Sequence, residues 1–234
     1  MENVISVMSR SELKYLMTAE QTDRVRRRLE GHMRVDGYGL TSIASIYYDT
    51  PDFRLIRASI ENEQFKEKLR LRSYGTADDT SPVYLELKRK CCGVVYKRRV
   101  QSTVPQAARF VAGERDEGLD DQLHREIAAF LDHYETLAPA CMIVYERVAY
   151  EEPEGDLRLT IDSAPRYRME GLSLDRLDGT ALLPEGYTIL EVKAQAAVPL
   201  WLARILSEER VYKSRFSKYG EAYRRECFAA HKAI

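Results

Sequence analysis

Three cations at alternating positions, Lys68, Arg70 and Arg72, form the sharpest chemical signal in the sequence. In an extended strand alternate side chains point to the same face, so these three would stand about 7 Å apart in a row. Arginine offers a bidentate fork to phosphate oxygens, and lysine offers a mobile point charge. The spacing therefore predicts a strand face that grips successive groups of a phosphate chain.

Two neighbouring segments continue this basic surface. In the run from Val83 to Lys90, Glu86, Lys88 and Lys90 share one face, while valine and leucine side chains occupy the other. After a short turn at residues 91–93, a third cluster follows that consists of Lys97, Arg98 and Arg99. These segments predict two more strands that bring cations to the same anion-binding surface.

Carboxylates and further cations alternate in the same way on other predicted strands. The pairs that share a strand face are Glu12 with Lys14, Tyr145 with Arg147, Arg158 with Asp162, and Glu191 with Lys193. A ring of cations alone would be very costly to enclose, and the carboxylates offset part of that charge. A wet interior with net positive charge makes physical sense only if it holds an anion.

Phosphoryl transfer would suit such an interior, because positioning, charge neutralisation and a divalent metal supply most of the catalysis without a protein nucleophile. Glu191 is the best candidate for a metal ligand, since a carboxylate among phosphate-binding cations can recruit Mg²⁺ or Mn²⁺. It could equally be a counter-ion to Lys193. Glu12 and Glu86 are weaker candidates that would mainly orient cations.

Other chemistries find little support in the sequence. The histidines all fall in or at the ends of predicted helices, and no nucleophile elbow, zinc-protease helix or Walker-type glycine loop occurs. No aromatic stacking platform lies among the cations, and the net charge of −1 gives no reason to expect nucleic-acid binding.

Five predicted helices must hold these strands in place. Thr18 and Gln21 form a capping box that opens a helix to about His32. The others run from Pro105 to about Ala112, Leu119 to about Leu137, Pro199 to about Glu209, and Lys218 to about Lys232. Residues 75–82 form a loop between strands.

A single charged strand face usually lies toward water. Six strands with such faces favour another arrangement, in which helices cover the apolar faces on the outside and the charged faces meet in a shared interior.

The 234 residues, with 44% hydrophobic and 31% charged side chains, suit one soluble globular domain that spans residues 1–234. No secretory signal opens the sequence and no apolar run of 18 residues occurs, so we expect a cytoplasmic protein without direct membrane insertion. The four cysteines, Cys91, Cys92, Cys141 and Cys227, are expected to be free thiols.

In the order and spacing of these motifs, the sequence resembles the VTC domain, the polyphosphate polymerase module of the triphosphate tunnel metalloenzyme superfamily. The resemblance spans most of the chain. It rests on Glu12-x-Lys14-Tyr15, Tyr48-Asp49-Thr50, Lys68-x-Arg70-x-Arg72, Leu85-Glu86-Leu87-Lys88-Arg89-Lys90, Tyr96-Lys97-Arg98-Arg99, Tyr145-x-Arg147-x-x-Tyr150, Arg158-x-Thr160-x-Asp162, Leu190-Glu191-Val192-Lys193 and Arg215-Phe216-Ser217-Lys218-Tyr219.

The resemblance implies an α+β fold in which an eight-stranded antiparallel β-barrel forms a tunnel with flanking helices. It also implies phosphoryl transfer from ATP to a growing inorganic polyphosphate chain, with Mn²⁺ or Mg²⁺ held by Glu191 and Glu12. The catalytic cations would be Lys68, Arg70, Arg72, Lys88, Arg147 and Arg158. The substrate-binding residues would be Lys14, Lys90, Lys97, Arg98, Lys193, Arg215, Ser217 and Lys218.

Two positions depart from the family pattern. Arg10 stands where the wider superfamily has the first glutamate of E-x-E-x-K, which argues against a plain tunnel triphosphatase. Arg215 stands where a lysine is expected. Eukaryotic members carry membrane regions that this chain lacks, so membrane coupling would require a separate partner protein. Two alternatives stay open: a tunnel hydrolase that cleaves triphosphate, and a non-catalytic module that binds polyphosphate or inositol phosphates.

Overall fold

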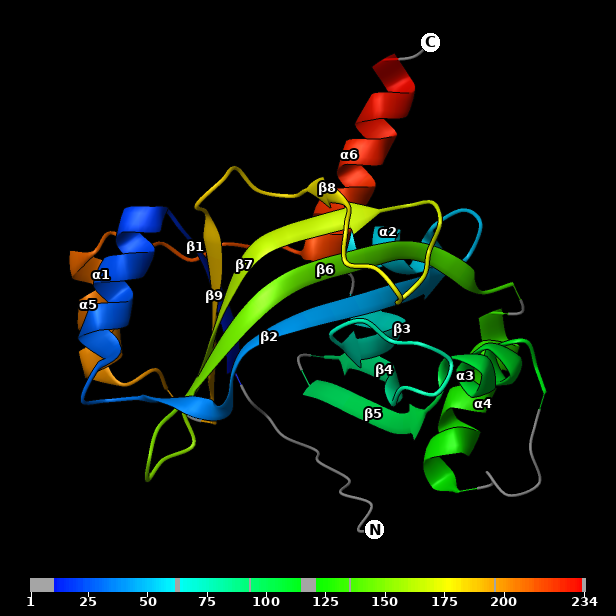
Figure 1. The fold of residues 1–234 in the computed structure, drawn as a ribbon, viewed down its shortest axis with the longest axis horizontal. Coiled ribbons are helices and arrows are strands. Elements are labelled where there is room, and N and C mark those ends of the chain that lie inside the picture. The colour runs from blue at the N-terminus through cyan, green and yellow to red at the C-terminus, as the bar shows by residue number, and fades with distance from the viewer. Residues whose placement is uncertain are drawn as a thin grey trace.

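An antiparallel sheet of nine strands organises the chain in the computed structural model (Figure 1). The structure describes residues 11–61, 64–92, 94–114, 121–134, 136–195 and 197–232. The strands are β1 (Ser11–Met17), β2 (Arg34–Asp49), β3 (Phe65–Tyr74), β4 (Val83–Cys91), β5 (Val94–Ser102), β6 (Ala138–Glu151), β7 (Arg158–Arg168), β8 (Thr180–Ala181) and β9 (Thr188–Ala194).

Eight of these strands form one continuous path in the order β1-β9-β7-β6-β2-β3-β4-β5, and the short β8 pairs with β7 alone. This arrangement confirms the predicted tunnel fold with its eight antiparallel strands. Within the described ranges, no backbone ladder joins β1 to β5, the two ends of the path. The Glu12–Lys88 ion pair, at 3.1 Å, instead links β1 to the β4–β5 hairpin.

The alternation of apolar and charged residues along the strands sorts them between two faces, as expected. In β3, Leu69 and Leu71 are buried in an apolar cluster, while Lys68 and Arg70 line a cavity on the opposite face. The same division holds in β9, where Leu190 and Val192 are buried in a second apolar cluster and Glu191 faces the cavity. The charged faces of these strands therefore point inward, away from the helices.

Six helices flank the sheet in the described chain: α1 (Ala19–Leu29), α2 (Arg54–Glu61), α3 (Val104–Val111), α4 (Gln122–Tyr134), α5 (Leu200–Glu208) and α6 (Lys218–Lys232). Five match the predicted segments. The predicted capping box opens α1: the Gln21 backbone N–H donates to Thr18 at 3.3 Å, and Thr18 N–H donates to the Gln21 side chain at 3.0 Å. The helix ends before His32, since Gly31 adopts a φ of 83°.

Helix α2 was not predicted, and its start is fixed by a buried carboxylate. Asp49 accepts hydrogen bonds from the backbone N–H groups of Leu55 at 2.8 Å and Ile56 at 3.0 Å. Tyr219 of α6 donates its hydroxyl to the same carboxylate at 2.9 Å. Burial raises the pKa of Asp49, and these hydrogen bonds oppose that effect. Asp49 thereby ties β2, α2 and α6 together.

The helices cover the outer face of the sheet in three groups, each with its own apolar cluster. Helices α1 and α5 pack over β1, β7 and β9, and helices α3 and α4 over β3, β4 and β5. Helices α2 and α6 pack over β2 and β6 (Figure 1). This packing satisfies the apolar face of every long strand and leaves the inner face for polar groups.

The structure also bears on two smaller predictions, for the loop at residues 75–82 and for the cysteines. Residues 75–82 form the loop between β3 and β4, as predicted. Within the described residues the four cysteines form no disulfide, as expected, with Cys91 and Cys92 exposed and Cys141 buried. Across the described chain, no helix combines the length and apolar character needed to cross a membrane.

Candidate functional site

The inner faces of the strands enclose a cavity of about 330 Å³ with mostly cationic walls. Seven strands and the start of α6 contribute to it, so residues far apart in the sequence meet in one space. The lining residues are Glu12, Lys14, Tyr47, Lys68, Arg70, Arg72, Lys88, Val95, Lys97, Tyr145, Arg147, Glu191, Lys193, Ser217, Lys218 and Tyr219. We call this space the cationic cavity.

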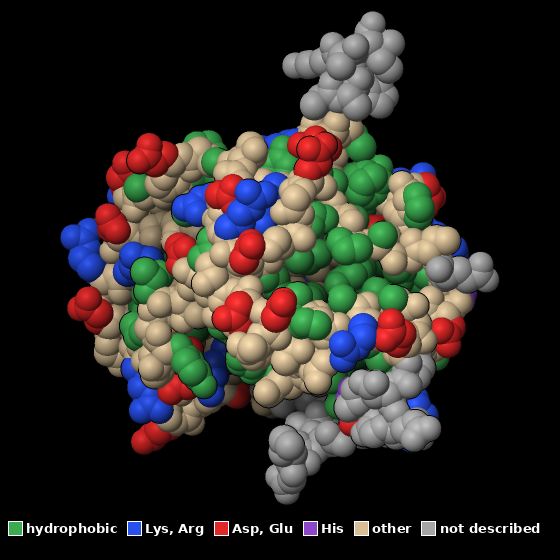
Figure 2. All heavy atoms as spheres, turned by 45° about the vertical axis from the view of Figure 1, so that its right-hand side comes forward, with side chains coloured by type: hydrophobic (Ala, Val, Ile, Leu, Met, Phe, Trp, Pro, Cys, Tyr) green, Lys and Arg blue, Asp and Glu red, His purple; other side chains and the backbone are tan. Residues whose placement is uncertain are grey.

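The positive charge of the cationic cavity exceeds its negative charge. Nine lysine and arginine side chains line it, against two lining carboxylates, Glu12 and Glu191. Two further carboxylates, Glu86 and Asp162, lie buried behind the wall at 1% and 0% exposure, which still leaves an excess of five positive charges. Outside, by contrast, cationic and anionic side chains are interspersed over the face shown in Figure 2.

Glu86 of β4 is the anchor for the cations of β3 and β5. Its carboxylate lies 2.6 Å from Arg70, 2.7 Å from Lys97 and 3.8 Å from Arg72. Burial alone would raise the pKa of Glu86, but Arg70, Arg72 and Lys97 hold it well below the usual range. Glu86 therefore stays ionised and fixes the guanidinium and ammonium groups in the wall.

Glu191 of β9 is a second anchor, and every ion-pair partner it has in the described chain comes from the cavity wall. The nearest is Lys14 at 3.2 Å, followed by Arg147 at 3.5 Å, Lys218 at 3.8 Å and Lys193 at 3.9 Å. Burial opposes ionisation of Glu191, but Lys14, Lys218 and Arg147 keep its pKa well below normal. Glu191 therefore stays ionised among four cations of the cavity wall.

Glu12 lies on the other side of the Lys14 ammonium, 3.7 Å from it, and 3.1 Å from Lys88. Burial favours the neutral acid, yet Lys88 and Lys14 lower the pKa of Glu12 to about 2. Lys14 is thus placed between two ionised carboxylates from β1 and β9. Burial would lower the pKa of Lys14, but Glu191 and Glu12 raise it above the usual value.

Asp162 of β7 holds the start of α6 against the wall. Its carboxylate accepts from Arg147 at 2.6 Å and also pairs with Lys218, the first residue of α6. Before α6, the Ser214 N–H donates to the Lys14 carbonyl at 2.7 Å, so this segment follows β1. These contacts bring Ser217 and Lys218 to the cavity, where the N-terminal end of a helix favours anions.

Three tyrosines of the cationic cavity, Tyr47, Tyr145 and Tyr219, were absent from the predicted site. The Tyr47 hydroxyl accepts from Arg70 at 3.1 Å, and its ring stacks on Tyr219 at 4.8 Å. Tyr145 accepts from Arg72 at 3.2 Å, and the Lys218 ammonium lies 4.2 Å from its ring centre. The strand period could have found Tyr145, since it shares a face with Arg147.

Crowding of like charges changes the protonation of the cavity wall. Burial, together with Lys14, Lys88 and Arg70, lowers the pKa of Lys68 to about 8. Burial alone would raise the pKa of Tyr47, but Arg70, Lys68 and Arg72 lower it to about 8. Both groups therefore have a pKa of about 8: burial and neighbouring cations act together on Lys68, whereas at Tyr47 the cations outweigh burial.

Twelve of the sixteen predicted site residues meet in the cationic cavity. They are Lys14, Lys68, Arg70, Arg72, Lys88, Arg147, Lys97, Lys193, Ser217, Lys218, Glu12 and Glu191. The convergence holds although the residues come from separate strands. The roles assigned to them as catalytic, substrate-binding or metal-binding groups stay predictions.

Four predicted residues lie elsewhere. Arg98 follows Lys97 directly, so it points to the outer face and donates to Glu126 of α4 at 2.6 Å. Arg158 is exposed and lies 3.5 Å from Glu151. Lys90, near the end of β4, and Arg215 are also exposed. Arg10 lies outside the described residues, so its departure from the family motif has no structural outcome.

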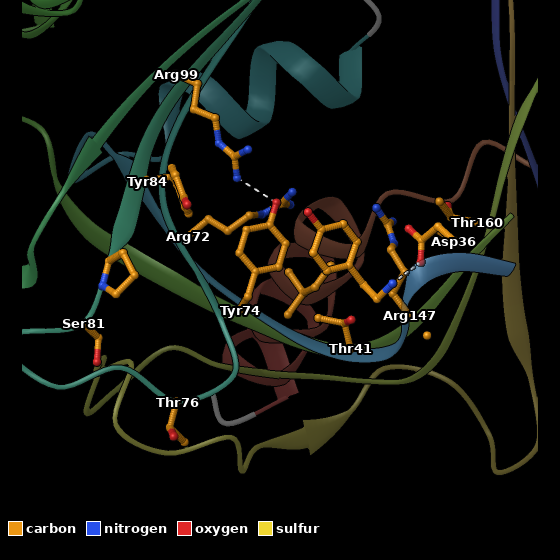
Figure 3. A pocket seen from close by; sticks show the side chains of 15 residues that line it. Asp36, Thr41, Arg72, Tyr74, Thr76, Ser81, Tyr84, Arg99, Arg147 and Thr160 are labelled. Atoms are coloured by element: carbon orange, nitrogen blue, oxygen red, sulfur yellow. Dashed lines mark hydrogen bonds between the residues drawn. The ribbon is translucent and has the colours of Figure 1, made fainter. Parts of the chain in front are cut away.

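A second cavity, of about 700 Å³, adjoins the first at Arg72 and Arg147, which line both (Figure 3). We call it the aromatic chamber, because Tyr38, Tyr74 and Tyr84 line it together with Arg99. Its remaining lining residues are Asp36, Gly39, Thr41, Ile43, Thr76, Ser81, Pro82, Ala149 and Thr160. Arg99 belongs to the predicted cluster of Lys97, Arg98 and Arg99, and the three tyrosines were not predicted.

The carboxylates of the cationic cavity fit a divalent metal of the Mg²⁺ type. Across the described residues, no group of three or more His, Cys, Asp or Glu side chains is arranged to hold a metal by itself. Mg²⁺ is commonly held by one or two carboxylates plus substrate phosphates, and Glu12 and Glu191 supply that number of carboxylates beside lysine and arginine side chains.

Comparison with known proteins agrees with the fold. A family profile described as the VTC domain matches residues 9–226. Curated protein sequences give no match. A Bacillus halodurans structure, described provisionally as an adenylate cyclase, is 14% identical with a TM-score of 0.55, covering 90% of this chain and 96% of its own. A Hippeastrum protein, described as an adenylyl cyclase candidate with a dominant triphosphatase activity, is 18% identical with a TM-score of 0.48, covering 89% and 92%.

Proposed function

Because this chain belongs to the VTC domain family, we propose that it is a polyphosphate polymerase that transfers the terminal phosphoryl group of ATP to an inorganic polyphosphate chain. The bond from the γ-phosphorus to the bridging oxygen breaks and leaves ADP. A terminal oxygen of the acceptor chain forms the new bond to the same phosphorus. The product is a chain one phosphate longer.

One observation carries this proposal: cations from six strands and from α6 surround one cavity that holds an excess of positive charge. A phosphate chain carries negative charge along its whole length, so it can contact many of these cations at once. A compact anion such as a single carboxylate would leave most of them without a partner. The charge of the cavity therefore supports an extended polyphosphate as ligand.

The arginines of the wall suit the transfer step. Arg70 is fixed by Glu86 and Tyr47, and Arg147 by Asp162, so their guanidinium groups are positioned before substrate binds. Fixed donors stabilise charge that develops on the transferred phosphoryl oxygens without a reorganisation cost. The flexible lysines, Lys68 and Lys88, can follow the anion as the chain moves.

Glu191 and Glu12 would hold the divalent metal together with phosphate oxygens. A bound Mg²⁺ or Mn²⁺ neutralises charge on the phosphates during transfer. Phosphate oxygens would also attract Lys14 away from the two carboxylates, since the ammonium now lies 3.2 Å from Glu191. Lys14 would in this way exchange a carboxylate partner for a substrate partner.

Incubation of the purified protein with ATP, Mn²⁺ and a short polyphosphate primer tests the proposal directly. We expect chains longer than the primer on a urea gel, with one ADP formed per phosphate added. The Arg70→Ala variant is a matched control, because it removes one cation of the cavity wall and should keep the fold. Absence of any lengthened chain with several metals would contradict the proposal.

Two other functions predict different products. A tunnel hydrolase would release orthophosphate from tripolyphosphate or ATP without making a longer chain. A binding module would hold polyphosphate or inositol phosphates tightly, in a salt-sensitive manner, with no turnover. The same incubation separates these cases, because orthophosphate, chain length and free ATP are measured in one sample.

A further inference from the structure

The ring and the hydroxyl of Tyr145 together contact three cations of the cationic cavity. The Lys218 ammonium lies 4.2 Å from the centre of the ring, and the Arg147 guanidinium carbon lies 5.1 Å from it. The hydroxyl accepts a hydrogen bond from Arg72 at 3.2 Å. These cations belong to α6, β6 and β3, so one side chain joins three elements of the wall. Tyr145 is 5% exposed, and packing therefore fixes its position.

A bulge in β7 lies opposite Tyr145. The register between β6 and β7 shifts between Val144 and Glu146, where Ala164 and Pro165 of β7 stand opposite Tyr145 alone. Ala164 adopts a φ of 46°, a left-handed conformation that is unusual for a residue with a side chain. Bulges increase the local twist of a strand and can redirect a side chain. The sheet therefore carries local strain directly opposite the residue that contacts the three cations.

Tyr145 differs from the carboxylate anchors of the wall, each of which neutralises part of the charge of the cations that it holds. Arg72 shows the difference most clearly. Its guanidinium donates to the hydroxyls of Ser45 and Tyr145, both at 3.2 Å, whereas its carboxylate partner in the described chain, Glu86, lies 3.8 Å away. A tyrosine carries no charge at neutral pH, so it orients a cation without reducing the positive charge that a ligand meets.

The burial of Arg72 gives independent support for an anion beside Tyr145. Arg72 is 7% exposed, and the carboxylate of Glu86 is too far from its guanidinium for a hydrogen bond. A buried cation that is held mainly by hydroxyls is costly unless a negative charge joins it. Arg72 lines the cationic cavity, as Arg147 and Lys218 do, so a phosphate in this cavity can supply that charge.

We propose that Tyr145 is a positioning residue, an uncharged anchor that orients Arg72, Arg147 and Lys218 toward the phosphates without neutralising them. The face of the ring holds Arg147 and Lys218 by cation–π attraction, and the hydroxyl holds Arg72. A phosphate that binds Arg72 then has no hydrogen-bonded carboxylate to displace. This inference rests on the proposed function, because it takes a phosphate chain as the ligand of the cationic cavity.

A series of fluorinated rings at position 145 tests this role, because fluorine withdraws electron density from the face of the ring and nearly preserves its shape. Tyr145→Phe is the first variant and removes only the hydroxyl. Phenylalanines with one, two and three ring fluorines then replace it, introduced by codon suppression. Calorimetry measures the binding of inorganic tripolyphosphate without ATP or metal. We expect the affinity to fall stepwise with fluorine content, by roughly 5- to 30-fold over the series, as for weakening of a buried cation–π contact.

Tyr145→Glu separates an uncharged anchor from a charged one. The carboxylate would still hold the neighbouring cations, but it would also neutralise one of them. We expect weaker tripolyphosphate binding than in Tyr145→Phe, with a shallower dependence on ionic strength. The control is the same fluorinated series at Tyr167, which is 6% exposed, lies outside both cavities and donates to Glu226 at 2.8 Å. Tripolyphosphate affinity should stay within about twofold there, because no cation of the cavity wall is held by that ring.

Equal affinity across the fluorinated series at Tyr145 would overturn the proposal, as would a loss of the same size at Tyr167. A folded Tyr145→Glu variant that binds tripolyphosphate as tightly as Tyr145→Phe would also overturn it; if this variant fails to fold, the fluorinated series decides alone. The outcomes separate this inference from the proposed function. A protein that lengthens chains but shows no trend with fluorine retains the function and loses the inference. A stepwise loss of anion binding in a protein that does not lengthen chains does the reverse.

Discussion

The Lys14 ammonium lies 3.2 Å from the carboxylate of Glu191, and it also pairs with Glu12 at 3.7 Å. A cation of the protein therefore stands between the two carboxylates that we propose as ligands of a divalent metal. Metal and phosphate should bind together, since phosphate offers Lys14 a new partner while the carboxylates accept the metal.

Glu191→Gln should abolish transfer but preserve anion binding. The amide keeps the shape of the side chain and removes its charge, so the proposed metal would lose a carboxylate ligand while the cavity becomes more positive. Because a metal contributes several kcal/mol to the transition state, we expect a loss of at least about 100-fold in the transfer rate. Tripolyphosphate affinity, measured by calorimetry, should be equal or higher. Retained transfer would show that Glu191 is only a counter-ion.

Arg70→Ala should weaken tripolyphosphate binding by about 1–3 kcal/mol, the range for a hydrogen bond to a charged group and its desolvation. Glu86 keeps Lys97, Arg72 and Arg99 as partners, so the fold should survive. Arg158→Ala is the matched control, since Arg158 is exposed and lies outside both cavities. Equal losses in the two variants would mean that β3 does not contact the phosphate chain.

Anion affinity should fall as pH rises from 7 to 9. The pKa of Lys68 is lowered to about 8, so this ammonium is charged below that pH and neutral above it. Tyr47, whose pKa is also lowered to about 8, gains a negative charge over the same range. Both changes reduce the attraction for phosphate. Lys68→Arg should flatten the profile in part, because arginine keeps its proton; an unchanged profile would exclude Lys68 as its source.

Asp49→Ala should lower the free energy of unfolding by about 2–4 kcal/mol, because buried donors of α2 and the Tyr219 hydroxyl lose their acceptor. Thermal unfolding followed by circular dichroism measures the change. Asp52→Ala is the control: Asp52 accepts from Thr50 and Arg57 at the surface, and its loss should cost less than about 1 kcal/mol. Similar losses in both variants would contradict a special role for Asp49.

Strand alternation was the feature of the sequence that predicted the site most reliably. Lys68, Arg70 and Arg72 alternate with leucines, and the structure places all three in the cationic cavity. The same rule explains a wrong expectation, since Lys97 and Arg98 are neighbours and cannot both face inward. The prediction grouped them because both are cations, although the two-residue period of a strand places them on opposite faces.

Other features depend on contacts that a single sequence does not display. The start of α2 is fixed by Asp49, which lies several residues before the helix and accepts from the N–H groups of Leu55 and Ile56. The residues next to the helix start give no strong capping signal. The aromatic chamber joins Tyr38 from a bulge in β2 with Tyr74 and Tyr84 from the β3–β4 hairpin. Bulges and loop geometry place these rings together, and neither follows from periodicity alone.

The Glu12–Lys88 ion pair joins β1, at one end of the strand path, to β4, the strand before the other end, where the described chain has no backbone ladder. A single ion pair can separate more easily than a hydrogen-bonded ladder, and under the proposed function a polyanion would compete with Glu12 for Lys88. A long polymer would not have to be threaded from its tip, because it could enter or leave sideways along this seam. Product release would then quicken with ionic strength, whatever the length of the product.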